Sequence, residues 1–372
     1  MKTVCALVML AASAAWAAAG ETAAKNLYEV PVSSVPGDLG TLLEGDEIAR
    51  WSYVFRPYGG GAADLVTDPG VVRDLVLGGA TAERKVTGFR ASADLDGVTL
   101  LVYCGEPSVA ATLAATNAPP LPGMEIYLTP SDADNTDPEV YWQFYLGNDW
   151  FREFEWPSQG RQWRPYLPLL TQRTQRVPTG YIFSLYLPWD GAFDRLPFNT
   201  GRLEQIWRVG VIRWVEGGVT WGGTVHEPSQ SGYIRFHFTE AQQTEIMGRI
   251  LERAWARFCN VSSAAPYAVA RPADGKWSRR AAVLDFPYVK ARQAKEGPRT
   301  YVNYGEDPSF APTLLSLETA AKALAPQIAA FREIRTMDER RAFYAHAADR
   351  LFNYAHNVRA AYAAHLKKGL FE

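Results

Sequence analysis

Between residues 45 and 240, short runs of apolar or alternating residues are separated by Gly, Pro, Asn and Asp. This pattern is typical of an antiparallel all-β domain, and helical periodicity is scarce over the same stretch. Seven runs read as strands: 85–94, 98–106, 123–130, 140–147, 180–189, 207–215 and 232–238. Seven strands of this length predict a β-sandwich.

Two details of the pattern predict local geometry. In the run 180–189, residues 181, 183, 185 and 187 are Tyr, Phe, Leu and Leu, and they share one face of an extended strand. That face is the better candidate for the core, because Ser184 lies on the other. The Asp96-Gly97 pair lies between two predicted strands, which is a strong signal for a β-hairpin.

The hydrophobic period changes after residue 239. Thr239 and Gln242 form a capping-box signature, and apolar residues then recur at helical spacing, which predicts a helix over 240–258. Thr336 and Glu339 form a second capping box, and the apolar residues that follow it line one stripe, which predicts one long helix over 336–369. Residues 260–311, between the two predicted helices, have no sustained hydrophobic period. The expected fold class is therefore mainly β: an antiparallel β-sandwich followed by an α-helical C-terminal extension.

The N-terminal residues are built like a bacterial secretory signal. Residues 1–19 contain one Lys, an apolar run and a closing series of Ala. We expect a cleaved signal over 1–19, an N-terminal segment over 20–44, the sandwich over 45–240, and the helical extension with an irregular linker over 241–372. No later segment approaches the roughly 20 apolar residues of a membrane span. The expected location is secreted or periplasmic.

Composition narrows the classes of partner. The chain has 372 residues, a formal net charge of -2 and a pI near 6.3, so it has no basic field to attract nucleic acid or an anionic membrane. Aromatic residues make up 13% of the chain, with 12 Trp, which suggests that some of their flat apolar faces do more than fill the core. Removal of the signal would leave Cys104 and Cys259, which either form a disulfide or remain free thiols in apolar surroundings.

Several motifs of the β region occur in an order that resembles the family 9 carbohydrate-binding modules and their relatives with the DOMON-type sandwich. The motifs are GMEIYL, VYWQFYLG, GYIFSLYLPW, WRVGVIRW, VTWGG and EPSQSGYIRF, and they cover about residues 85–238. The resemblance implies an exported, non-catalytic β-sandwich of jelly-roll type that binds a polysaccharide or oligosaccharide. Its ligand would stack on aromatic rings and hydrogen-bond to polar side chains between them.

The resemblance also implies roles for particular residues. Trp221 matches a residue of the aromatic clamp, and Glu125 matches the acidic residue that accepts hydrogen bonds from sugar hydroxyls. The position at which the family has a basic residue corresponds to the neighbourhood of Tyr145 in this chain. The chain has APPLPG where the family has an earlier clamp Trp, before Glu125. Trp142 lies in the aromatic-rich strand of the same pattern. Glycines flank Trp221 on both sides, so we expect either ligand contact or packing within a loop.

Three further residues have two interpretations each. Trp150 and Trp163 belong to residues 148–166, a predicted loop that either lines a polysaccharide groove or folds over a sheet with its aromatic residues buried. Arg213 either contacts sugar or pairs with Glu216. Trp189, which follows a strand and a Pro, is expected to fill the core.

One loop contains oxygen ligands of the kind that calcium prefers. Asp132, Asp134 and Asp137 lie close together, without EF-hand spacing. An Asp-rich turn is the default interpretation and a structural calcium site is the alternative. No zinc, haem-attachment, phosphate-loop or nucleophile-elbow motif is present.

Two alternatives to a sugar-binding protein stay open. Some sandwiches of this type hold haem through Met and His, and Met124 with His226 or His237 is the candidate pair. The other is an ancillary domain of a polysaccharide-degrading enzyme, because two carboxylates distant in sequence can still form a catalytic pair. The C-terminal helices are a candidate surface for a protein partner.

Overall fold

The structure is a computed structural model that describes most of the β region and the C-terminal helices. The described residues are 27–53, 55–57, 86–106, 123–129, 140–146, 150–155, 160–162, 171–189, 200–214, 218–223, 232–261, 307–352 and 354–369. The predicted signal segment lies outside them. Within these ranges no helix is both long enough and apolar enough to cross a membrane.

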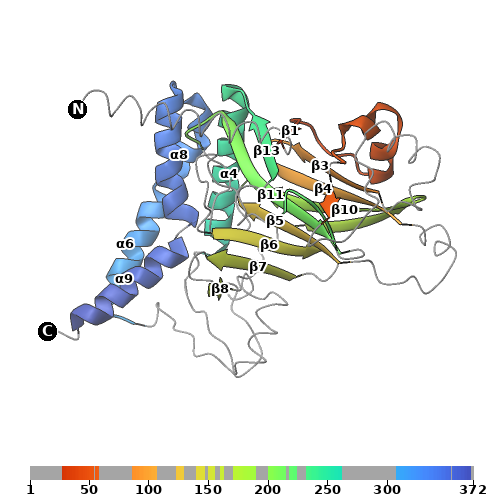
Figure 1. Ribbon diagram of the computed structural model, residues 1–372. Helices are drawn as coiled ribbons and strands as arrows, with labels where there is room; N and C mark the ends of the chain where they lie inside the picture. Colours follow the sequence, from red (N-terminus) through yellow and green to blue (C-terminus); the bar gives the residue numbers. More distant parts are fainter. Residues whose placement is uncertain are drawn as a thin grey trace, which may run out of the picture.

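Two mostly antiparallel sheets form the β region (Figure 1). The larger has the order β1-β13-β11-β5-β6-β7-β8, with β12 paired to both β11 and β2. Its strands are β1 (Leu27–Val30), β2 (Arg56–Pro57), β5 (Met124–Thr129), β6 (Val140–Leu146), β7 (Trp150–Glu155), β8 (Gly160–Gln162), β11 (Glu204–Arg213), β12 (Val219–Trp221) and β13 (Gly232–His237). All described pairs in this sheet are antiparallel except β1 with β13.

The smaller sheet has the order β3-β4-β10-β9 and is antiparallel throughout. Its strands are β3 (Thr87–Ala93), β4 (Gly97–Gly105), β9 (Thr171–Val177) and β10 (Gly180–Pro188). The predicted hairpin at Asp96-Gly97 is confirmed, since it joins β3 to β4. Gly97 is required there, because a Cβ would collide with the carbonyl oxygen of Leu187 and the ring of Tyr186.

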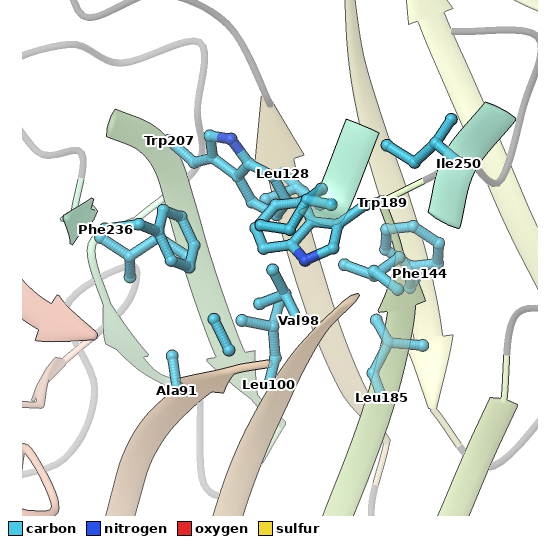
Figure 2. Packing of buried hydrophobic residues seen from close by; sticks show 14 of the residues in the cluster. Ala91, Val98, Leu100, Leu128, Phe144, Leu185, Trp189, Trp207, Phe236 and Ile250 are labelled. Atoms are coloured by element: carbon cyan, nitrogen blue, oxygen red, sulfur yellow. The ribbon is translucent and has the colours of Figure 1, made fainter. Parts of the chain in front are cut away.

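The main core lies between the two sheets. Alternate residues of each strand point into this core, and the face of β10 that was predicted to be apolar is the one that lines it. Figure 2 shows Trp189 packed among residues of both sheets and next to Ile250 of the first helix. Trp189 is fully buried and meets Trp207 edge to face, with ring centroids 5.6 Å apart. The prediction that Trp189 fills the core is confirmed.

A second, smaller core covers the outer face of the four-stranded sheet. Two 3-10 helices, η2 (Leu39–Leu43) and η3 (Gly45–Arg50), lie over β4 and β10. The indole of Trp51 donates to the carbonyl of Leu42 at 2.8 Å and fixes this cover in place. The second core consists of Leu39, Leu42, Leu43, Ile48, Trp51, Tyr53, Val86, Leu101, Tyr103, Val177 and Ile182.

The helical part begins with α4 (Glu240–Val261), and the capping box of Thr239 and Gln242 is present as predicted. The following elements are α6 (Ala311–Lys322), α7 (Ala325–Ala329), η8 (Phe331–Glu333), α8 (Met337–Phe352) and α9 (Tyr354–Gly369). The helical stripe predicted over 336–369 is confirmed as α8 and α9, between which only Asn353 lies outside the described residues. Leu351 and Tyr354, near the two facing ends, are apolar and buried.

Apolar packing and ion pairs attach the helices to the sandwich. Ile246, Met247 and Ile250 of α4 belong to the same buried cluster as the sheet residues, and α4 runs beside the sheets with α8 on its far side (Figure 1). Asp96, in the β3–β4 turn, accepts hydrogen bonds from Arg249 and Arg253 of α4, each at 2.6 Å. The helical extension is thus continuous with the sandwich core.

Two other expectations are settled within the described residues. The loop predicted over 148–166 contains two strands, β7 and β8, so the loop prediction is wrong for those residues. Cys104 is buried in the sandwich and Cys259 is exposed on α4, and both are free thiols. Burial raises the pKa of the Cys104 thiol to about 11.

Candidate functional site

Trp214 presents an exposed aromatic ring at the end of β11. Its side chain is 40% exposed, and its backbone N–H donates to the carbonyl of Gly123 at 3.0 Å, which continues the pairing of β11 with β5. Trp207, Val209 and Val211 point into the core, so the two-residue period of the strand directs Trp214 to the outer face. The strand therefore offers its last aromatic ring to solvent.

Polar side chains of β5 and β6 lie beside this ring. The indole Nε1 of Trp214 donates to Oε1 of Glu125 at 3.1 Å. Oε2 of Glu125 accepts from the Tyr127 hydroxyl and from Nε2 of Gln143, both at 2.6 Å. Gln143 Nε2 also lies 3.0 Å from the Tyr127 hydroxyl. We call these four residues, Trp214, Glu125, Tyr127 and Gln143, the outer-face cluster.

The register of the sheet explains why the cluster forms. Glu125 faces Ile212 of β11, and Tyr127 faces Gln143 of β6. All these residues alternate with core residues such as Ile126, so their side chains share the outer face. Glu125, Tyr127 and Gln143 are nearly buried, while the neighbouring indole is open. Hydrogen bonds among neighbours hold each polar group in one orientation.

Arg213 anchors the same strand end on the opposite face. Its side chain has no solvent exposure, and Nη2 contacts a carboxylate oxygen of Glu106 at 2.6 Å. The guanidinium also donates to the Gly105 carbonyl at 2.8 Å and to the Thr87 hydroxyl at 3.0 Å, so it links the larger sheet to β3 and β4. The interpretation of Arg213 as a sugar contact is wrong, because its side chain is fully buried and faces the interior, where it contacts Glu106. Glu216, the partner in the other interpretation, lies outside the described residues.

Trp221, for which ligand contact was one of two expected roles, is buried. It is 1% exposed and stacks on Phe89 of the other sheet, with ring centroids 4.4 Å apart. Its indole Nε1 donates to the Ser52 hydroxyl at 2.9 Å. Pairing with Val211 explains this position, since a residue opposite an inward-facing residue also faces inward. The prediction that Trp221 is a solvent-facing clamp is therefore wrong.

Of the remaining predicted site residues, the structure describes the backbone of three. Tyr145 and Trp142 lie in β6, with Tyr145 opposite Glu125, and Trp150 begins β7. Their side chains are outside the described ones. Trp163 and the candidate calcium ligands Asp132, Asp134 and Asp137 lie outside the described residues altogether. Among the described residues, no group of three or more His, Cys, Asp or Glu side chains could hold a metal ion.

The candidate haem ligands do not come together. Met124 points into the core and faces Arg213, whereas His237 is exposed and faces Glu204 at the other end of β11. Nine residues of strand separate the two positions, which is about 30 Å. His226 lies outside the described residues. Met124 and His237 cannot ligate one iron in this fold.

Sequence reasoning missed three members of the cluster, Trp214, Tyr127 and Gln143. The signal for Trp214 was available, since Trp207 and Trp214 are seven residues apart on one strand and an odd separation places them on opposite faces. One indole had to be inside and the other outside. Tyr127 and Gln143 could be found only from the pairing of β5 with β6, which the sequence does not reveal.

Comparison with known proteins gives structural likeness only. No family model matches the chain, and no curated protein matches it. Among solved structures, a family 9 carbohydrate-binding module from Caldicellulosiruptor kristjanssonii is similar in its complex with glucose (TM-score 0.31, 13% identity, 57% of this chain and 96% of the other). Its complex with cellotriose is similar at a TM-score of 0.29 and 11% identity, over 57% of this chain and 94% of the other.

A third similar structure is a carbohydrate-binding candidate from Bacteroides uniformis, with a TM-score of 0.33 and 12% identity over 57% of this chain and 99% of the other. The two Caldicellulosiruptor structures belong to the family that the strand motifs of the sequence resemble.

Proposed function

We propose that this chain is an exported, non-catalytic carbohydrate-binding protein that recognises its ligand at the outer-face cluster. One observation carries the proposal: the open ring of Trp214 lies beside the fixed carboxylate of Glu125, at 3.1 Å from indole nitrogen to carboxylate oxygen. A pyranose has an apolar C–H face and a belt of hydroxyl groups. An exposed flat ring next to oriented polar groups matches both features.

The proposed mechanism is recognition without chemistry. The Trp214 face would cover the apolar side of a pyranose, and the Glu125 carboxylate would accept a hydrogen bond from a hydroxyl at the edge of the ring. Tyr127 and Gln143 already donate to Glu125, so its carboxylate needs no reorientation when a ligand arrives. With Trp214 as the one exposed aromatic ring among the described side chains of the cluster, we expect dissociation constants in the micromolar to millimolar range.

Two further parts of the proposal concern location and assembly. The signal-like residues 1–19 support export to the periplasm or the medium. The helices α6 and α9 carry the exposed residues Leu315 and Leu366, which support a role as a contact surface for a protein partner. Neither part is needed for sugar recognition at Trp214.

A glycan array probed with the purified protein, followed by calorimetric titration of the strongest ligand, tests the function. We expect Trp214→Ala to weaken binding by at least about tenfold, because the loss of a stacked ring removes roughly 1.5–3 kcal/mol of apolar contact. Leu315→Ala is the matched control, since it also removes an exposed apolar side chain, on α6. An array without a single glycan ligand, or equal affinity in both variants, would refute the proposal.

A further inference from the structure

The Glu125 carboxylate is nearly buried, at 9% exposure, yet its hydrogen-bond donors among the described side chains are neutral. They are the Tyr127 hydroxyl, the Gln143 amide and the Trp214 indole. A buried charge is costly unless an opposite charge accompanies it. The cluster thus holds a negative charge that its own hydrogen-bond partners do not neutralise.

Nearby basic residues of β11 are directed elsewhere. Arg213 is next to Trp214 in sequence but faces the interior, where Glu106 pairs with it. Arg208 shares the outer face of β11, but it lies opposite Thr129, about 13 Å along β5 from Glu125. Arg152 lies in β7 opposite Gln143, two strands or about 10 Å from β5, and its side chain is outside the described ones.

The free acceptor position of the carboxylate faces the open ring. An ionised carboxylate has about four acceptor positions, and three donors occupy three of them. Oε2 accepts two hydrogen bonds and Oε1 accepts only the one from Trp214. Because an indole N–H lies in the plane of its ring, Oε1 is at the edge of the Trp214 ring, which is 40% exposed. A ligand stacked on Trp214 therefore meets this oxygen with its edge substituents.

We infer that the site selects a positively charged sugar, namely a hexosamine unit with a free amino group, over a neutral sugar of the same size. The inference rests on the proposed function, since the pyranose must first stack on Trp214. An ammonium group at the sugar's edge donates a charge-assisted hydrogen bond to Oε1 and supplies the missing positive charge. The indole face also attracts a nearby cation. The ligand class is thus a deacetylated, amino-sugar polymer.

Three oligosaccharides of equal length separate charge from shape. We would titrate the full chain calorimetrically at pH 6 with a β-1,4-linked glucosamine tetramer, its N-acetylated counterpart and cellotetraose. We expect the glucosamine tetramer to bind at least about tenfold more tightly than either neutral ligand. The advantage should shrink as salt rises from 20 to 500 mM, because screening weakens an ion pair that a ligand reaches from solvent.

Two variants locate the effect. Glu125→Gln keeps the shape of the side chain and removes its charge, so the preference for the glucosamine tetramer over cellotetraose should fall to within about threefold. Glu204→Gln is the matched control, because Glu204 is an exposed carboxylate at the other end of β11. It makes the net charge of the protein less negative by the same one unit and should leave the preference unchanged.

The outcomes separate the inference from the function. Equal or tighter binding of cellotetraose overturns the inference and leaves sugar binding intact. An equal loss of preference in both variants also overturns it, because the effect would then come from net charge. If none of the three tetramers binds and the glycan array is also empty, the proposed function fails and the inference fails with it.

Discussion

The indole Nε1 of Trp214 donates a hydrogen bond of 3.1 Å to Oε1 of Glu125, and this bond joins an open apolar surface to a nearly buried charge. The two residues belong to adjacent strands, β11 and β5, whose register fixes their separation. Since Arg213 holds the same strand end from the interior, the position of Trp214 depends on the packing of both sheets.

Trp221→Ala should destabilise the fold strongly. The ring fills space between the sheets, stacks on Phe89 and bonds Ser52, so its removal leaves a large cavity. We expect the free energy of unfolding to fall by about 3–5 kcal/mol, measured by urea denaturation. Trp214→Ala should cost far less, because its ring is exposed. Comparable losses in the two variants would contradict the assignment of one indole to the core and the other to the surface.

Arg213→Leu should be costly in the same assay. The substitution leaves Glu106 without its buried partner and leaves the Gly105 carbonyl without its donor. We expect a loss of about 3–5 kcal/mol. Arg235→Leu is the control, because Arg235 pairs with Glu29 on the exposed surface and such pairs are worth about 0–1 kcal/mol. A loss below about 1 kcal/mol for Arg213→Leu would show that the buried guanidinium is not a structural link.

Tyr127→Phe should weaken sugar binding without unfolding the protein. The variant keeps the ring and removes the hydroxyl that donates to Glu125 at 2.6 Å, so the carboxylate becomes less firmly oriented. We expect affinity to fall by roughly three- to tenfold, the effect of about 0.5–1.5 kcal/mol for one hydrogen bond. Tyr103→Phe removes a hydroxyl that bonds Thr179 in the smaller sheet, and its affinity should match that of the wild type. Loss in both variants would point to general destabilisation instead.

Acid should loosen the attachment of η8 to α4. Hydrogen bonds from Arg332 and Arg249 lower the pKa of Glu245 to about 2. An ordinary Glu has a pKa near 4.3, so these bonds stabilise the fold fully above about pH 4.3, and their contribution is lost as the pH falls toward 2. The contribution therefore has the sign expected for a carboxylate whose folded pKa is lowered.

Calorimetry from pH 2 to 6 measures this contribution. Glu245→Gln should melt at a lower temperature than the wild type at pH 6, and the difference should shrink toward zero near pH 2. Glu333→Gln, a change at an exposed carboxylate of η8, should show no such pH-dependent difference. A wild-type advantage over Glu245→Gln that stays constant with pH would mean that ionisation of Glu245 does not stabilise the contact.

The strands that form the core could be predicted from the sequence, because short runs of apolar or alternating apolar and polar residues mark them. β3, β4, β5, β6, β10, β11 and β13 all lie within the predicted runs or overlap them closely. The edge strand β9 was not predicted, since its sequence TQRTQRV has no apolar face and its ladder depends on β10. Likewise, β7 reads as a charged aromatic loop until the register with β6 is known.

The candidate site was only half predictable. Glu125 was identified, because an acidic residue on an otherwise apolar strand is conspicuous. The partner ring was assigned to Trp221, since flanking glycines suggested an open loop. Those glycines have another role: Gly222 and Gly223 adopt positive φ, and Trp221 packs so closely over Gly232 that no Cβ fits there. Small residues made room for a buried indole, which local sequence cannot distinguish from an exposed one.

The indole region of a ¹⁵N-HSQC spectrum shows directly whether a glycan binds at Trp214. The signal of Trp214 Nε1–H is assigned by its absence in Trp214→Phe, and those of Trp221 and Trp189 in the same way. Upon titration with a glycan that binds, we expect a progressive shift of the Trp214 signal while the signals of the two buried indoles stay in place. A saturating glycan that leaves the Trp214 signal unmoved would show that the ligand binds elsewhere.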